Sequence, residues 1–396
     1  MHNIRGVRLS AIDRLGIMGL VSSFAVALVV TIWAIYIDTF VHNASYVGFI
    51  TAFFTIIGTL SYIFLTPLIE RCNKVKLYGL TILTYIISYI LFAFLSSLYV
   101  VIILGSILAI TGSLKIIVFG IIFRDKTKDN SVSKNEGLIY TIINLSWFIA
   151  PIVAGFIANK YGIKEVFLLA AGILLINSFL FRIFNIKDNQ KNKKIDKKPL
   201  KQFFNYFKDK KRVHAYFLGG GVNLWWSLIY IYIPIYLYEL GLGEKIIGYF
   251  LGAVVLPLIL TEYYFGKLAG KKGFRKIFLI GYLILSVVAF TAFFIPNIYL
   301  LLGILILASL GTAMLESTTE AYFFDVITTK ERDKYYGPYN TTIELNSFLG
   351  SALPAVILLF LPFKSIFLFF GAAMLILSLM SLRIKEVIES KKKSKH

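Results

Sequence analysis

The chain has 396 residues, 58% of them hydrophobic, and a mean hydropathy of +0.77. Soluble globular domains are about 45–50% apolar, so this composition excludes an ordinary soluble protein. The formal net charge of +20 would also suit a nucleic-acid-binding protein, but the basic residues are placed as in a membrane protein and no nucleic-acid partner is expected.

Apolar stretches of membrane-spanning length recur along the whole chain, and each can cross a hydrocarbon core of about 30 Å as a helix. Unbroken runs such as LYVVIILGSILAI, residues 98–110, exclude the alternating pattern of a transmembrane β-barrel. The first stretch is too long for a signal peptide and lacks a small-residue cleavage site, so we expect a retained helix. The sequence predicts an all-α polytopic membrane protein with twelve spans, near residues 15–37, 47–66, 77–95, 98–122, 138–158, 165–184, 214–237, 246–265, 276–295, 298–322, 339–361 and 364–384.

The loops on the two sides of the predicted membrane differ strongly in Lys and Arg. One side holds only four, Lys160, Lys164, Lys245 and Lys364, and almost all of the others lie on the opposite side. By the positive-inside rule the basic side is cytoplasmic. We therefore expect a multi-pass protein of the plasma membrane, with both termini in the cytoplasm and some basic side chains against anionic lipid head groups.

Few residues are suited to metal, redox or nucleotide chemistry. Cys72 is the single cysteine, so no intramolecular disulfide is possible, and the four histidines are scattered along the chain. No G-x-x-x-x-G-K-[ST] motif is present, so the chain is not expected to hydrolyse ATP. The sequence predicts no metal site and no cofactor.

One long polar segment, residues 186–212, separates six predicted spans from six. The sequence therefore predicts an N-terminal six-helix half at 1–185, a basic cytoplasmic linker at 186–212 and a C-terminal six-helix half at 213–396. Within the linker, PLKQFFNYFKDKK (residues 199–211) fits two alternatives, a short amphipathic helix on the membrane surface or an unstructured segment.

The two halves repeat at a constant offset of 200 residues. The repeat is parallel, because an even number of spans separates the copies, and parallel six-span halves are one of the transporter architectures. The offset aligns Gly48 with Gly248, Leu68 with Leu268, Asp125 with Asp325, Gly137 with Gly337 and Thr141 with Thr341.

Three loop segments carry short motifs. GKLAGKKGFRK, residues 266–276, resembles the signature G-x-L-A-D-R-x-G-R-K of the major facilitator superfamily of secondary transporters, with Gly270 in place of the signature aspartate. TPLIERCNKVK, residues 66–76, is a degenerate copy, and FFDVITTKERDKYYG, residues 323–337, resembles the family's loop before span eleven. The matching residues are Gly266, Leu268, Ala269 and Gly273 in the first segment, Leu68, Glu70, Arg71 and Lys74 in the second, and Asp325 and Arg332 in the third, with Asp125 in its first-half copy.

The resemblance implies a non-enzymatic transporter of two six-helix halves that expose a central cavity alternately to either side. It also implies that Glu70 and Arg71 help to latch the outward-facing state. The simpler interpretation of the same residues is that basic loops only fix the topology. The chain is expected to act as a monomer.

Charged residues inside predicted spans are the main candidates for function, because an ionised side chain in hydrocarbon is costly. In span 298–322, Ser309, Thr312, Glu316 and Glu320 fall on one helix face. Glu316 lies about 9 Å inside the hydrocarbon at 1.5 Å per residue, and we interpret it as a protonatable or substrate-binding group. Glu320 lies near the interface, where pairing with cytoplasmic Lys or Arg is the simpler interpretation.

Lys115 and Glu344 are placed at similar depth in spans 98–122 and 339–361. The resemblance implies that Lys115 and Glu316 face the central cavity from opposite halves. Two interpretations stay open for Lys115, Glu316 and Glu344, a proton-exchanging group and a static salt bridge between the halves.

Aromatic and amide side chains at helical spacing predict a substrate cavity. Asn223, Trp226 and Tyr230 share one face of span 214–237, and Asn144 and Trp147 share a face of span 138–158. Such walls suit a small amphipathic ligand, and ordinary helix packing is the alternative. Gly219, Gly220 and Gly221 either soften the end of their span or allow close helix packing.

The function predicted from these features is secondary transport of a small organic solute by alternating access, with protons as a candidate coupling ion. The alternatives are a membrane-embedded lipid-linked transferase and a non-transporting sensor on the same scaffold. The residues do not specify the solute, since mixed charges fit zwitterions or organic anions, and aromatics with acids fit hydrophobic cations.

Overall fold

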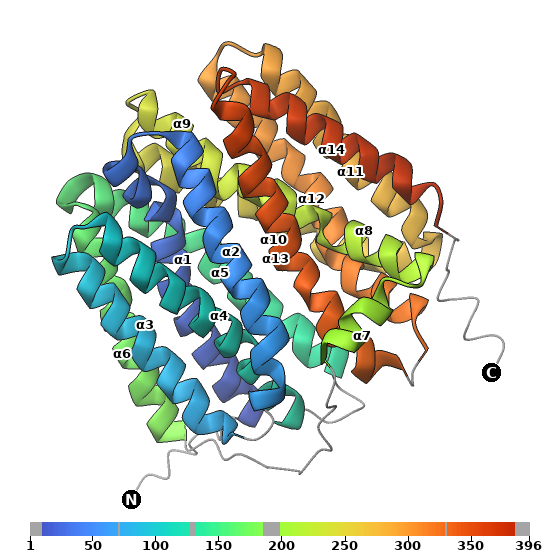
Figure 1. The fold of residues 1–396 in the computed structure, drawn as a ribbon, viewed down its shortest axis with the longest axis horizontal. Helices are drawn as coiled ribbons and strands as arrows, with labels where there is room; N and C mark the ends of the chain where they lie inside the picture. The colour runs from blue at the N-terminus through green and yellow to red at the C-terminus, as the bar shows by residue number, and fades with distance from the viewer. Residues whose placement is uncertain (1–9, 70–71, 127–131, 185–198, 329–330, 385–396) are drawn as a thin grey trace, which may run out of the picture.

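The computed structural model describes residues 10–69, 72–126, 132–184, 199–328 and 331–384, and their regular secondary structure is helical throughout (Figure 1). The first half contains α1 (Ala11–Val41), α2 (Ala44–Ile69), α3 (Lys74–Phe94), α4 (Leu98–Lys126), α5 (Val132–Tyr161) and α6 (Ile163–Phe184). The short α7 (Pro199–Tyr206) precedes α8 (Lys210–Ser227), a π-helical turn (Leu228–Tyr232), α9 (Ile233–Glu239), α10 (Gly243–Lys272), α11 (Phe274–Phe294), α12 (Ile298–Val326), α13 (Arg332–Leu358) and α14 (Ser365–Ser381).

The predicted spans all coincide with these helices. Eleven are long and apolar enough to cross a membrane, including the continuous segment of α8, the π-helical turn and α9. The twelfth, α14, is apolar but only 17 residues long. The expected all-α polytopic fold is confirmed. Of the two alternatives for residues 199–211, the helical one holds for the part that forms α7.

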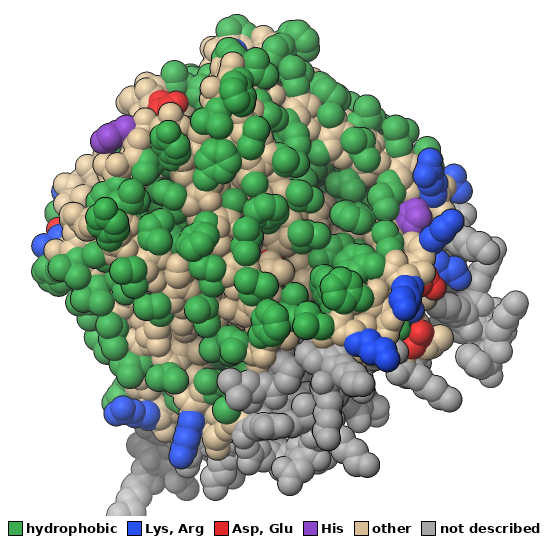
Figure 2. Space-filling view, in the orientation of Figure 1, with side chains coloured by type: hydrophobic (Ala, Val, Ile, Leu, Met, Phe, Trp, Pro, Cys, Tyr) green, Lys and Arg blue, Asp and Glu red, His purple; other side chains and the backbone are tan. Residues whose placement is uncertain are grey.

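The surface of the bundle is apolar across its middle. Figure 2 shows hydrophobic side chains over most of the visible face, with Lys and Arg gathered at its right-hand and lower margins. Large exposed apolar side chains occur on many of the helices, for example Phe64, Leu80, Ile103, Phe179 and Leu260. A water-facing surface rarely exposes so much contiguous apolar area, whereas a lipid-facing surface requires it.

The helix boundaries repeat with the offset seen in the sequence. The boundaries of α3, Lys74 and Phe94, recur 200 residues later as those of α11, Phe274 and Phe294. The boundaries of α4, 98 and 126, likewise recur in α12 as 298 and 326. The internal repeat therefore extends from residue matches to whole elements.

Two seams join the halves, one between α2 and α13 and the other between α5 and α10. We call the end of the bundle that carries Lys74, Lys210 and Lys272 the basic end. At the far end of both seams the backbones meet closely: Gly155 lies against the backbone of Gly248, and Gly48 against that of Ser351. A Cβ atom at any of these glycines would overlap the facing helix, so the halves are closely packed at the end remote from the basic end.

The run Gly219–Gly221 serves helix packing. A Cβ at Gly220 would overlap Thr342 and Asn346 of α13, and one at Gly221 would overlap Leu377 and Tyr282. The neighbouring helices thus approach α8 where it has no side chains. Of the two interpretations of this glycine run, the structure favours close packing.

We expect Gly220→Val to lower the stability of the C-terminal half by about 1–3 kcal/mol, because overpacking forces neighbouring side chains out of their rotamers. The measurement is the thermal unfolding midpoint of the detergent-purified protein. Gly303→Val is the matched control, since a Cβ at Gly303 meets no atom within 4 Å. Equal midpoints for the two variants would contradict the packing role of Gly220.

Candidate functional site

The polar face of α12 points into the C-terminal half. Ser309 and Thr312 are fully buried, and Glu316 is half-buried one turn further along. The Glu316 carboxylate accepts a hydrogen bond from Trp226 Nε1 of α8 at 2.5 Å. These three side chains therefore face the protein interior and not lipid, as expected for polar groups on a membrane-spanning helix.

Three aromatic rings connect Glu316 to the other half. The rings of Trp226 and Tyr230 have centroids 5.5 Å apart, and Tyr230 meets Trp147 of α5 edge-on at 5.7 Å. Tyr230 lies on the π-helical turn, where Ile233 donates its N–H to Leu228. Pro234 follows this turn and has no N–H to donate to the carbonyl of Tyr230. The α-helical hydrogen-bond pattern is interrupted there, and the wider π-helical turn takes its place.

A second carboxylate, Glu262 of α10, completes this cluster. It accepts a hydrogen bond of 3.2 Å from Asn144 Nδ2 of α5, across the seam between the halves. It also lies close enough to Glu316 for the two carboxylates to interact electrostatically. Glu262 was not among the residues predicted from sequence, although it is an acid inside a predicted span, which is the signal that singled out Glu316 and Glu344.

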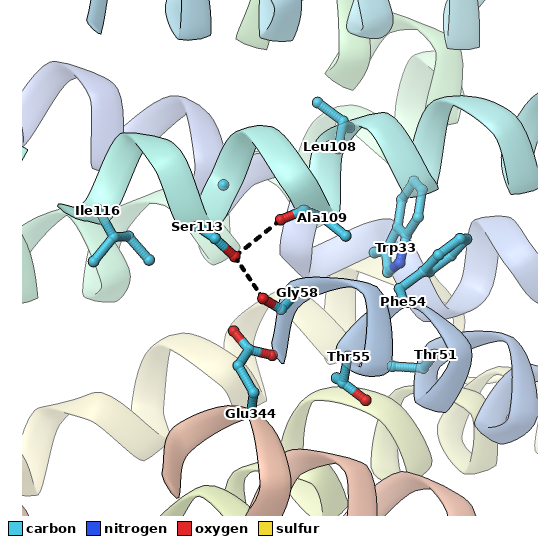
Figure 3. A pocket seen from close by; sticks show the side chains of 11 residues that line it. Trp33, Thr51, Phe54, Thr55, Gly58, Leu108, Ala109, Ser113, Ile116 and Glu344 are labelled. Atoms are coloured by element: carbon cyan, nitrogen blue, oxygen red, sulfur yellow. Dashed lines mark hydrogen bonds between the residues drawn. The ribbon is translucent and has the colours of Figure 1, made fainter. Parts of the chain in front are cut away.

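Glu344 belongs to a different place, the seam between α13 and α2. Its carboxylate lies against Gly58, with Oε2 3.2 Å from the position of a Cβ on that glycine. It also interacts electrostatically with the hydroxyls of Tyr62 and Tyr85. Figure 3 shows this carboxylate among the side chains that line a cavity. The cavity has a volume of about 240 Å³ and is lined by Trp33, Thr51, Phe54, Thr55, Gly58, Leu108, Ala109, Gly112, Ser113, Ile116 and Glu344.

Lys115 forms no salt bridge to Glu316 or Glu344. Its Nζ lies 3.3 Å from Ser22 Oγ and 4.8 Å from the ring centroid of Tyr85. The static salt bridge between the halves, one of the two interpretations left open by the sequence, is therefore absent in this structure. The partner of Glu316 is Trp226, because α12 turns Glu316 toward α8 whereas α4 turns Lys115 toward α1 and α3.

The two seams are related by the 200-residue repeat. Asn144 and Glu344 are equivalent positions, and so are Glu262 and Tyr62. On one seam Asn144 meets Glu262, and on the other Glu344 interacts with Tyr62. At these two pairs of equivalent positions each seam thus has a glutamate, on α10 in one seam and on α13 in the other, which are not equivalent helices.

The two remaining candidates, a charge-coupling residue and a substrate-cavity residue, lie outside this cluster. Glu320 accepts a hydrogen bond of 2.6 Å from the hydroxyl of Tyr336 on α13, rather than from Lys or Arg as expected. Asn223 is half-buried on α8, and within the described residues its side chain makes no hydrogen bond to this cluster.

The loop motifs are only partly described. Gly273 has φ +90° between α10 and α11, a conformation that favours glycine at the turn joining the two helices. Ala269 and Lys74 are buried, and Leu268 packs beside the C-terminal core while Gly266 faces Ser317. Asp325 is half-buried near the end of α12. Glu70, Arg71 and the side chains of Leu68, Asp125 and Arg332 lie outside the described residues, so the latch stays a prediction.

Within the described ranges, no three His, Cys, Asp or Glu side chains are grouped to hold a metal ion.

The profile of the Major Facilitator Superfamily matches residues 15–259 and 222–396. The chain is 24% identical to an uncharacterised MFS-type transporter of Methanocaldococcus jannaschii over 54% of its length, and 25% identical to the staphylopine export protein of Staphylococcus aureus over 62%. These matches span 56% and 62% of the two relatives.

Solved transporter structures share the fold. A POT family transporter in complex with a thioalcohol-conjugated peptide superposes with a TM-score of 0.79 at 14% identity, covering 94% of this chain and 95% of the other. A mutant of the nucleoside transporter NupG superposes with a TM-score of 0.79 at 11% identity, covering 93% of this chain and 98% of the other. At such identities the likeness establishes the fold and leaves the solute open.

Proposed function

Because the chain belongs to the Major Facilitator Superfamily, we propose that it is a proton-coupled secondary transporter that moves a small organic solute across the plasma membrane by alternating access. The observation that carries the proposal is the cluster of Glu316, Glu262 and Asn144. It holds two carboxylates inside the membrane-spanning part of the bundle, and one of them is hydrogen-bonded across the seam to the other half.

The geometry supplies a way to couple charge to movement. Two carboxylates that interact at this depth repel each other when both are ionised, and a bound proton or cationic group relieves the repulsion. Separation of α5 from α10 breaks the bond between Asn144 and Glu262. The charge state of the cluster and the closure of the seam are therefore linked.

The charge distribution supports an orientation of the protein in the membrane, and one relative supports a direction of transport. With the basic end in the cytoplasm, the closely packed end of the seams faces outward. Both seams are formed within one chain, which supports function as a monomer. The S. aureus relative is named as an exporter, and this supports export as the direction of transport.

The test is transport by the purified protein in proteoliposomes that contain the pH dye pyranine. A panel of amines, zwitterions and organic anions is added under an imposed pH gradient. We expect one class of solute to cross chemically unchanged and to move protons in the opposite direction. Chemical conversion of the solute would support the transferase alternative, and binding without movement would support the sensor.

A further inference from the structure

We propose that the cavity beside Glu344 binds the ammonium group of the transported solute, so that the solute is an organic amine or a quaternary ammonium ion. The inference rests on the proposed function and adds to it the chemical class of the solute. The binding elements come from both halves, with Glu344 on α13 and the facing residues on α1, α2 and α4 (Figure 3).

The charge of the cavity selects a cation. Among the described residues, Glu344 is the only charged one that lines the cavity, and none of them makes a hydrogen bond or ion pair with its carboxylate. Lys115 is on a neighbouring face of α4, where Ser22 and the ring of Tyr85 hold its ammonium group away from the cavity. An anionic group in the cavity would face Glu344 without compensation from a lining cation.

The hydroxyl groups of the lining also favour a positively charged group over an anion. Thr51 donates to the carbonyl of Val47, and Thr55 donates to that of Ala52. Ser113 Oγ lies 3.2 Å from the carbonyl oxygens of Gly58 and Ala109 and donates to them. Because these hydrogens are engaged, the hydroxyl oxygens offer only lone pairs to a ligand. Lone pairs suit the N–H groups of a protonated amine and the positively polarised methyl groups of a quaternary ammonium ion, and they do not suit a carboxylate.

Two aromatic rings complete the recognition of a cation. Trp33 and Phe54 line the cavity, with ring centroids 6.1 Å apart and planes inclined by 46°. Such faces attract ammonium groups through the ring quadrupole, most effectively where water is excluded. The volume of about 240 Å³ lies just below the usual range for drug-sized ligands and is suited to the ammonium end of a solute.

A bound ammonium ion would also link the halves. It would be attracted to Glu344 from the C-terminal half and to Trp33 and Phe54 from the N-terminal half. The site is therefore complete only while α13 and α2 stay together. Opening of this seam would disassemble it and release the solute.

The test is a thermal-shift assay of the full chain in detergent with four probes, choline, benzyltrimethylammonium, benzoate and 3,3-dimethylbutan-1-ol. The last is the neutral isostere of choline. We expect both ammonium ions to raise the unfolding midpoint and the other two to leave it unchanged, because a ligand of the native state stabilises it. Glu344→Gln should weaken ammonium binding about 10- to 100-fold, the loss expected for a charge-assisted contact.

Glu320→Gln is the matched control and should bind the ammonium ions as the wild type does. If Glu344→Gln is poorly folded, Trp33→Leu replaces it, with a smaller loss of ammonium affinity expected. The inference is overturned if neither ammonium ion stabilises the wild type, if the neutral alcohol does so equally, or if stabilisation persists in the folded variants.

The assay needs no gradient, so the two proposals can fail separately. Ammonium binding without any flux in proteoliposomes contradicts the transporter proposal alone. Proton-coupled flux of an anion or neutral solute, without ammonium binding, contradicts the solute class alone.

Discussion

Replacing Glu316 with glutamine is expected to reduce pH-gradient-driven transport to background while exchange of labelled for unlabelled solute continues. The glutamine keeps an oxygen that accepts the hydrogen bond from Trp226 Nε1, so the local packing is preserved. It cannot take up or release a proton, so the coupled step is lost. Both rates are measured on the same proteoliposomes, with and without an imposed pH gradient.

Glu320→Gln is the control for this experiment. Glu320 lies on the same helix and is hydrogen-bonded to Tyr336, outside the cluster of Glu316, Glu262 and Asn144. Its variant should keep most of the gradient-driven transport. Wild-type uptake by Glu316→Gln under the gradient would refute the role of Glu316 as the coupling carboxylate.

The second large effect is expected at the close contact between α5 and α10. A Cβ on Gly155 would overlap backbone atoms of Glu244 and Gly248, which cannot move aside as a flexible side chain can. Gly155→Ala should therefore prevent the halves from closing at this end and abolish net transport. The helix itself is retained, because alanine is a better helix former than glycine.

The measurement combines solute flux with the circular-dichroism spectrum, which should show unchanged helix content. Gly172→Ala on α6 is the matched control, since a Cβ there meets no atom within 4 Å. It should transport at the wild-type rate. Wild-type flux in Gly155→Ala would show that this contact does not take part in the transport cycle.

The spans and the repeat were predictable because both follow from patterns along the chain. Uninterrupted hydropathy indicates a helix wherever lipid surrounds it, and the 200-residue offset of Gly48 and Gly248 corresponds to equivalent glycines on the two seams. The polar face of Ser309, Thr312 and Glu316 follows from helical spacing alone.

The partners of the buried charges were not predictable, because they depend on helix rotation and on contacts distant in sequence. Depth alone made Lys115 a reasonable partner for Glu316, but the two helices turn these side chains to different neighbours. The hydrogen bond from Asn144 to Glu262 joins residues 118 positions apart. The π-helical turn at Tyr230 depends on Pro234 together with the surrounding packing. The sequence pattern of this segment is that of an α-helix, so the turn could not be predicted from it.

The central claim, that the halves alternate about their seams, is tested most directly by a cross-link at the closely packed end. Asn159 on α5 faces Gly243 at the start of α10, with its Nδ2 3.3 Å from the position of a Cβ on that glycine. Asn159→Cys and Gly243→Cys are combined in a Cys72→Ser background and joined by a short bis-thiosulfonate reagent. Each single-cysteine variant is the control.

Gly243 has φ +72°, and a cysteine there costs on the order of 1–2 kcal/mol, so flux is first confirmed in the reduced double variant. The account predicts that cross-linking reduces solute flux to background and that a reducing agent restores it. If the fully cross-linked protein transports solute as fast as the protein without the cross-link, alternating access through these seams is contradicted.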